Sequence, residues 1–193
     1  MVKDQEWVVT RIDGKIASVC ADFRHLRTIT DWVMKQPADS VSEITVGKVG
    51  MEELASLSMQ TKWEDMKLIG TPFQLKVWRQ LYLLTHREDG TPIHPEEGIS
   101  LLSYSQLAAL CENPQGVRAV AHATAKNLVA YIIPCHLIVP KEAIDKILAI
   151  RTVAEGTIFK GTDLYLLDSI DVGGYEYGSA LKRRVIEMQL YRR

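Results

Sequence analysis

Cys135 and His136 are neighbours in the stretch IIPCHLIVP, where a nucleophile and a base stand together behind Pro134. A thiol becomes a strong nucleophile only as a thiolate, which a nearby base or positive charge favours. Adjacent side chains of an extended strand point to opposite faces, so the two residues cooperate only if the chain turns here. Pro134 favours such a departure from a regular strand. The alternative is a buried structural cysteine beside a surface histidine.

The first third of the sequence predicts a small scaffold without a catalytic signature. Residues 6–22 contain two short apolar stretches around an Asp-Gly turn, which predicts a hairpin. Residues 25–36 carry apolar side chains at helical spacing, and residues 41–49 are typical of a further strand. Residues 51–67 indicate a helix or a linker.

Three helices are predicted in the middle of the chain. Thr71 lies three residues before Gln74 and forms a capping box that opens the first of them. Ser103 and Gln106 form a second box in SYSQLAAL, and residues 117–127 predict the third helix after the break CENPQG. Two short helices across a tight turn are typical of a helix-turn-helix, whose second helix enters a DNA groove, although most helix pairs only pack.

The remaining segments place the Cys-His pair between a strand and further helices. Residues 128–134 are an apolar run that predicts a short strand leading to Cys135. Residues 141–155 have helical spacing, and residues 179–193 predict an amphipathic last helix. The basic stretch LKRR in that helix is interpreted as a solvated face.

The composition of the 193 residues narrows the class of protein. Hydrophobic residues make up 47% and charged residues 24%, which predicts an ordinary folded core. No apolar run reaches the ~18 residues of a membrane span and no signal peptide stands out, so we expect a cytoplasmic protein. Three unclustered cysteines indicate neither a disulfide framework nor a metal site. With a net charge of −1, nucleic-acid binding would need a local basic patch.

Four stretches, in this order, resemble the O6-alkylguanine-DNA alkyltransferases, also called methylated-DNA–protein-cysteine methyltransferases: GTPFQLKVW, SYSQLAAL, NPQGVRAVAHATAKN and IIPCHLIVP. The resemblance covers roughly residues 69–140, with weaker support at 173–190. It implies an α+β fold: a small α/β N-terminal domain (1–68) and a helical C-terminal domain (69–193) with a helix-turn-helix and a short active-site strand. An insertion near 141–172 lengthens the family pattern.

The resemblance also implies a reaction and a partner. In this family the damaged guanine is flipped out of the duplex, and the cysteine accepts its alkyl group once, without a metal or organic cofactor. The implied partner is double-stranded DNA containing O6-alkylguanine, and the implied state is a monomer. Cys135 resembles the alkyl acceptor, and His136 resembles the base that activates it through a water.

The same resemblance assigns further residues one by one. Arg118 would fill the space left by the flipped base, and Tyr104 would help to rotate the nucleotide near its 3′ phosphate. The alternatives are a phosphate contact or an ordinary surface charge for Arg118 and simple packing for Tyr104. Lys126 joins them as a DNA-binding residue. Asn127 would brace the turn before the active site, and Tyr175 would donate to the guanine.

Two positions of the site depart from the family pattern. Leu137 stands where the family has an arginine, and Gln189 stands where its last helix supplies a glutamate that orients the histidine. An amide orients an imidazole without stabilising imidazolium by charge, so we expect a less acidic thiol and slower transfer. Gln189 should lie at the edge of the apolar face, with Glu187 toward solvent. That face is predicted from three residues: Leu181, Val185 and Met188.

Several alternatives stay open at this point. Tyr177 competes with Tyr175 for the role of donor to the guanine. Leu137 and Gln189 favour a second function, in which the protein binds alkylated DNA without efficient transfer. A cysteine hydrolase using the Cys-His pair is a third function, although the sequence offers no clear third triad member or oxyanion feature.

Overall fold

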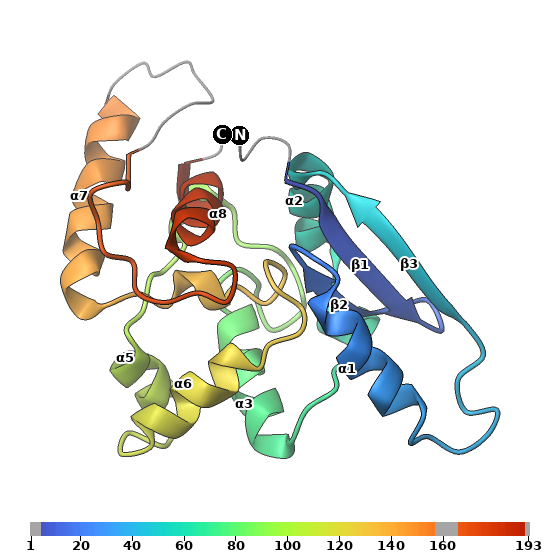
Figure 1. Ribbon diagram of the computed structural model, residues 1–193. Coiled ribbons are helices and arrows are strands. Elements are labelled where there is room, and N and C mark those ends of the chain that lie inside the picture. Colours follow the sequence, from blue (N-terminus) through green and yellow to red (C-terminus); the bar gives the residue numbers. More distant parts are fainter. Residues whose placement is uncertain (1–4, 157–165, 192–193) are drawn as a thin grey trace.

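The computed structural model describes residues 5–156 and 166–191, which form a small sheet at one side of the molecule, with most of the helices on the other side (Figure 1). The strands are β1 (Trp7–Ile12), β2 (Lys15–Cys20) and β3 (Ile44–Val49). They are antiparallel in the order β2-β1-β3. The hairpin turn uses left-handed backbone at Asp13 and Gly14, which an Asp-Gly pair tolerates. The predicted hairpin, third strand and α+β class are confirmed.

The described helices follow the predicted ones closely. They are α1 (Arg24–Val33), α2 (Met51–Gln60), η1 (Trp63–Asp65), α3 (Pro72–Tyr82), α4 (Pro95–Gly98), α5 (Tyr104–Leu110), α6 (Val117–Ala125), η2 (Cys135–Leu137), α7 (Lys141–Gly156) and α8 (Ser179–Tyr191). None of these helices has both the length and the apolar character that crossing a membrane requires. The end of the last predicted helix, residues 192–193, and part of the predicted insertion, residues 157–165, lie outside the described residues.

Both predicted capping boxes are present and fix where α3 and α5 begin. The Thr71 amide donates to Gln74 Oε1 at 2.8 Å, and the Gln74 amide donates to Thr71 Oγ1 at 3.3 Å. Ser103 and Gln106 make the equivalent pair at 2.8 and 3.3 Å. These bonds satisfy amides that the first helical turn leaves without partners. The helix starts are therefore defined locally, as the sequence indicates.

The buried indole of Trp78 holds α3 against α6. Its ring nitrogen donates to the carbonyl oxygen of Ala123 at 2.8 Å. Because Ala123 lies in α6 and Trp78 in α3, this bond fixes the position of the second helix of the α5–α6 pair. Figure 1 shows α3, α5 and α6 gathered on one side of the molecule, away from the sheet.

One continuous core connects the sheet with the helices. Trp7 and Val19 from the sheet belong to the same buried cluster as Leu81 of α3 and Ile186 of α8. A smaller cluster lies under α1, around Ile29. The division into domains at residue 68 stays a prediction, because the core itself crosses that position.

The predicted active-site strand at 128–134 is wrong. These residues make only isolated bridges, of which one pairs Val129 with Val19 beside β2. Tyr131 has a φ of 72°, and the Ile133 amide donates to the Val129 carbonyl at 3.0 Å. The chain therefore coils instead of running extended, because a left-handed residue cannot continue a strand. A short apolar run does not distinguish a buried coil from a buried strand.

The buried face of α8 is also shifted from the prediction. Leu181 and Met188 are only half-buried. The fully buried residues of this helix are Lys182, Val185, Ile186, Glu187 and Leu190. Glu187 is 7% exposed, so its predicted direction toward solvent is wrong. Its carboxylate accepts from the Leu167 amide at 2.8 Å and from Arg184 at 2.5 Å. The chain at Leu167 contacts this side of the helix, and a helical pattern alone does not reveal such a contact.

We expect Trp78→Phe to lower the free energy of unfolding by about 0.5–1.5 kcal/mol, because the Ala123 carbonyl loses the indole donor and keeps only the longer bond of 3.2 Å from the Lys126 amide. Urea denaturation followed by circular dichroism measures this loss. Trp63→Phe is the matched control, since the Trp63 indole makes no hydrogen bond within the described residues and is half-buried. Equal losses in the two variants would show that the bond to α6 adds nothing.

Candidate active site

Cys135 and His136 lie in η2, a one-turn helix that follows the coiled segment. Because the chain turns here, the two side chains are not forced to opposite faces. The turn that their cooperation requires is therefore present. Cys135 is partly exposed, whereas His136 is fully buried. The side chain of Leu137 is fully buried as well. The position where the family has an arginine therefore contributes to the core and offers no hydrogen-bond donors.

Asn127 braces the backbone that leads to the sulfur. Its Nδ2 donates to the Ile133 carbonyl at 2.8 Å, and its Oδ1 accepts from the Val129 amide at 3.0 Å. The same Nδ2 lies 3.4 Å from Cys135 Sγ. A single buried amide thus closes the turn and also contacts the sulfur. The predicted bracing contact is confirmed, and the role of Asn127 toward a substrate stays a prediction.

His136 and Gln189 form a hydrogen bond between Nε2 and Oε1. An amide oxygen accepts only, so Nε2 carries the proton and Nδ1 keeps a lone pair. Nδ1 has no partner among the described residues. Burial lowers the pKa of His136 to about 3, although the hydrogen bond that the imidazole donates to Gln189 opposes this effect. The predicted contact of the amide is confirmed, and the result is a neutral imidazole with one nitrogen available as a base.

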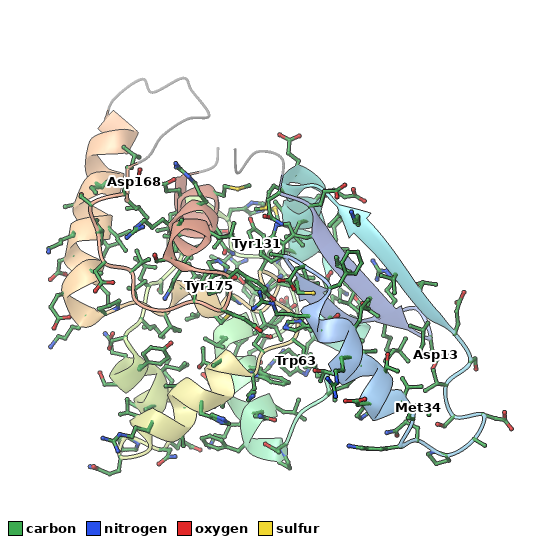
Figure 2. All side chains as sticks on the ribbon, in the orientation of Figure 1. Asp13, Met34, Trp63, Tyr131, Asp168 and Tyr175 are labelled. Atoms are coloured by element: carbon green, nitrogen blue, oxygen red, sulfur yellow. The ribbon has the colours of Figure 1, made fainter. Side chains whose placement is uncertain are left out.

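Tyr131 packs its ring against the imidazole of His136. The ring centroids are 5.5 Å apart and the planes differ by 24°. Tyr131 is also the residue with the left-handed backbone, a conformation that costs a bulky residue about 1–3 kcal/mol. The ring contact accompanies this strain and restricts the plane of the imidazole. Figure 2 labels Tyr131 and Tyr175, whose side chains both lie in the crowded interior between α8 and the sheet.

The thiol of Cys135 is less acidic than an ordinary cysteine. Burial raises its pKa, and the charge of Glu176 adds to this effect. The contact with Asn127 and the positive charge of Lys182 act in the opposite direction. Burial is the largest cause of the raised pKa, and the expected effect of Gln189 on this thiol stays a prediction.

Lys182 is a site residue that the sequence analysis missed. It lies on the stretch LKRR, which the sequence assigned to a solvated face, yet it is only 1% exposed. Its Nζ donates to the Ile138 carbonyl at 2.7 Å and to the Gly174 carbonyl at 3.1 Å. Burial lowers the pKa of Lys182 to about 8. Lys182 lies seven residues, or two helical turns, before Gln189, so the two residues share one side of the helix. This spacing is the feature of the sequence that could have identified Lys182 as a site residue.

Tyr175 and Tyr177 both have buried hydroxyls without a partner among the described residues. Their rings meet edge to face at 5.3 Å. Burial raises the pKa of both phenols, so both are neutral donors. The charge of Cys135 adds to the effect of burial on both phenols. Tyr175 and Tyr177 therefore stay alternatives for the donor to the guanine.

The predicted DNA-binding residues lie at the start of α5 and at the two ends of α6. Tyr104 is the first residue of α5 and is half-buried, and the charge of Cys135 contributes to a raised pKa after burial. Arg118 is exposed near the start of α6, and Lys126 is exposed at its end. Within the described chain neither cation forms an ion pair, so both charges are available to another molecule. Their roles stay predictions.

A cavity of about 340 Å³ lies between α1, the end of α6 and the segment before α8. Its lining comprises Arg24, His25, Thr28, Ile69, Gln74, Ala125, Lys126, Asn127, Leu128 and Glu176. Cys135 does not line the cavity, but Asn127 contacts both the cavity and Sγ. The volume falls in the range of small-molecule pockets.

Comparison with known proteins agrees with this arrangement. Residues 99–146 match the family model described as "6-O-methylguanine DNA methyltransferase, DNA binding domain". A probable methylated-DNA–protein-cysteine methyltransferase of Acanthamoeba polyphaga mimivirus is 42% identical over 77 residues, 40% of this chain and 44% of that protein. The corresponding protein of Methanosarcina mazei is 33% identical over 120 residues, 61% of this chain and 64% of that protein.

Solved structures show the same fold at low identity. The O6-methylguanine-DNA methyltransferase of Pyrococcus kodakaraensis aligns with a TM-score of 0.52 at 17% identity, covering 95% of this chain and 91% of that one. A Mycobacterium tuberculosis O6-methylguanine methyltransferase gives 0.51 at 18%, covering 96% and 94%. The sequence matches, however, span less than half the length of the mimivirus protein. The resemblance to the O6-alkylguanine-DNA alkyltransferases is confirmed, and so is the fold.

Replacing Gln189 by glutamate should raise the pKa of His136 above its value of about 3, because a carboxylate compensates the charge of imidazolium. NMR titration of the ring nitrogens measures this pKa. Gln189→Met is the matched control of similar size, which removes the hydrogen bond without adding charge and should not raise the pKa. An unchanged pKa in the glutamate variant would show that residue 189 does not govern the imidazole.

Alkylation of Cys135 by iodoacetamide should accelerate with pH throughout the range 6.5–9, by up to about tenfold per pH unit, because only the thiolate reacts. The raised pKa of this thiol keeps the thiolate fraction small at neutral pH. Mass spectrometry of the adduct gives the rate. Lys182→Met, which removes the stabilising positive charge, should slow the reaction near pH 8. A rate that is independent of pH would mean that the thiol is already ionised.

Proposed function

We propose that this protein repairs DNA by transferring an alkyl group from O6 of guanine to Sγ of Cys135, once per chain and without a cofactor. The observation that carries the proposal is the His136–Gln189 hydrogen bond, which leaves Nδ1 as a free base next to a partly exposed cysteine. The match of residues 99–146 to a DNA-binding domain supports the choice of DNA as the partner.

The reaction that we derive begins with removal of the thiol proton. His136 Nδ1 accepts this proton through a water, and the thiolate attacks the alkyl carbon. The S–C bond forms as the C–O6 bond breaks, and the guanine leaves with the bonding electrons. The guanine then takes a proton from a phenol, for which Tyr175 is our candidate because its buried hydroxyl has no partner in the described chain. The phenolate regains its proton from imidazolium, directly or through solvent, so the protons balance.

Helix α6 reads the position of the lesion through the groove of the duplex. Arg118 enters the stack in place of the everted base, Tyr104 contacts the neighbouring phosphate, and Lys126 neutralises another phosphate. Eversion of a base costs a few kcal/mol, which inserted and charged side chains offset. The exposure of both cations supports these assignments. The partner is double-stranded DNA containing O6-alkylguanine, and the protein acts as a monomer in the cytoplasm.

A specific observation favours a second candidate function, the binding of alkylated DNA with little transfer. The neutral His136, whose pKa lies near 3, gains no charge stabilisation from Gln189 when it accepts a proton. Cys135 also has a raised pKa. Both effects increase the barrier to transfer relative to a site with a carboxylate at position 189. The two functions therefore differ in rate and share the same DNA complex.

Intact-mass measurement after incubation with an O6-methylguanine oligonucleotide distinguishes the two functions. We expect a gain of one methyl group, which Cys135→Ala abolishes while DNA binding persists. Gln189→Glu should increase the rate of transfer by roughly tenfold or more, because each pKa unit gained by His136 is worth about 1.4 kcal/mol. DNA binding with no methylated protein in either chain would support the second candidate and refute repair.

A further inference from the structure

We propose that α1 holds the active site together, with His25 as a positioning residue that ties the turn after Asn127 to the loop carrying Tyr175. The inference rests on the proposed function for its effect on alkyl transfer. The contacts themselves are independent of that function. They give the first third of the chain, which the sequence analysis interpreted as a scaffold, a direct connection to the site.

The imidazole of His25 lies between two acceptors from segments that are far apart in sequence. Its Nδ1 is 3.2 Å from the carbonyl oxygen of Leu128, and its Nε2 is 3.4 Å from Glu176 Oε2. A carbonyl and a carboxylate accept only, so both ring nitrogens must carry protons to make both contacts. The geometry therefore calls for an imidazolium, which is 6% exposed at its side chain and compensated by Glu176.

The two partners of His25 adjoin the residues that carry the proposed chemistry. Leu128 follows Asn127, whose amide lies 3.4 Å from Cys135 Sγ. Glu176 stands between Tyr175 and Tyr177, the two phenols with unpartnered hydroxyls. One imidazolium thus connects the brace of the sulfur with the phenol loop.

Arg24, the neighbour of His25 on α1, adds a second connection to the same loop. Its Nη1 donates to the Glu176 carbonyl at 3.2 Å and lies 3.7 Å from Glu176 Oε1. Its guanidinium also lies 5.0 Å from the centre of the Tyr177 ring. Asp22 holds Arg24 from the other side at 2.6 Å. Because Glu176 is partly exposed, we attribute the larger share of the connection to the buried His25.

The charged and titratable groups around His25 keep it protonated. Burial lowers the pKa of His25, but Cys20 of β2 and Glu176 outweigh burial and raise it to about 9. Asp22 and Arg24 flank it on its own segment, Tyr177 packs beside it from the loop, and Lys126 lines the same cavity. Since the pKa is raised from 6.5 to about 9, the contribution of His25 is complete below pH 6.5, decreases above it and is lost as the pH rises through 9.

Hydrogen exchange and transfer kinetics of His25→Phe test the inference. Phenylalanine retains a ring beside Tyr177 but donates to neither acceptor. We expect amides of residues 127–129 and 173–178 to exchange roughly tenfold faster, with unchanged exchange in α3. Transfer to Cys135 should slow while DNA affinity is kept. Arg27→Ala, on an exposed part of α1, is the matched control and should behave like the parent chain.

A charged replacement provides a measurement that would not change if His25 acted only through packing. His25→Arg can donate to both acceptors and does not titrate, so it should restore the slow exchange. The transfer rate of the parent chain should stop rising near pH 9, whereas that of the arginine variant should continue to rise with the thiolate fraction. If His25→Phe does not fold, Glu176→Gln replaces it, because this change removes the compensating charge.

The outcomes separate the inference from the proposed function. Exchange in His25→Phe equal to that of the parent chain would overturn the inference, whether or not alkyl transfer occurs. Absence of transfer in the parent chain would refute the proposed function and leave the exchange result to decide on His25. If His25→Arg does not restore slow exchange, the inference is also overturned, because the contact would then not depend on two donated protons.

Discussion

The hydrogen bond between His136 and Gln189 is the constraint on which the candidate site depends. Because Gln189 offers an oxygen to Nε2, the proton of the neutral imidazole is held on that nitrogen and Nδ1 is left with its lone pair. Burial keeps the ring neutral, and Tyr131 fixes its plane. An imidazole held in this tautomer keeps a lone pair on Nδ1 and can act as a base, which the opposite tautomer could not do at that nitrogen.

The surrounding groups set how difficult the proton transfer is. Burial raises the pKa of Cys135 and lowers the pKa of His136, so both groups stay neutral at rest. Lys182 is the buried positive charge that favours the thiolate, and its ammonium group is held by two backbone carbonyls. A carboxylate at position 189 would stabilise the imidazolium, and the amide does not. The site therefore holds the imidazole in one tautomer but does little to compensate the charge of an imidazolium.

The sequence predicted the elements better than it predicted which surfaces they bury. The capping boxes at Thr71 and Ser103 are local, so the helix starts follow directly from the residues. The Cys-His pair was identified from its residue types, and the amide at Gln189 was identified through the family resemblance. By contrast, the coil at Tyr131 and the burial of Glu187 arise from packing between distant segments. Lys182 and His25 were missed for the same reason, since a basic residue on a helix is ordinarily solvated.

The number of methyl groups removed from DNA per protein chain, with the oligonucleotide in excess, tests the central claim most directly. If the sulfur of Cys135 is the final acceptor, removal stops at one equivalent, and peptide mapping finds the methyl group on Cys135 alone. Removal that continues beyond one equivalent, or a methyl group carried by Cys20 or Cys111, would contradict the account.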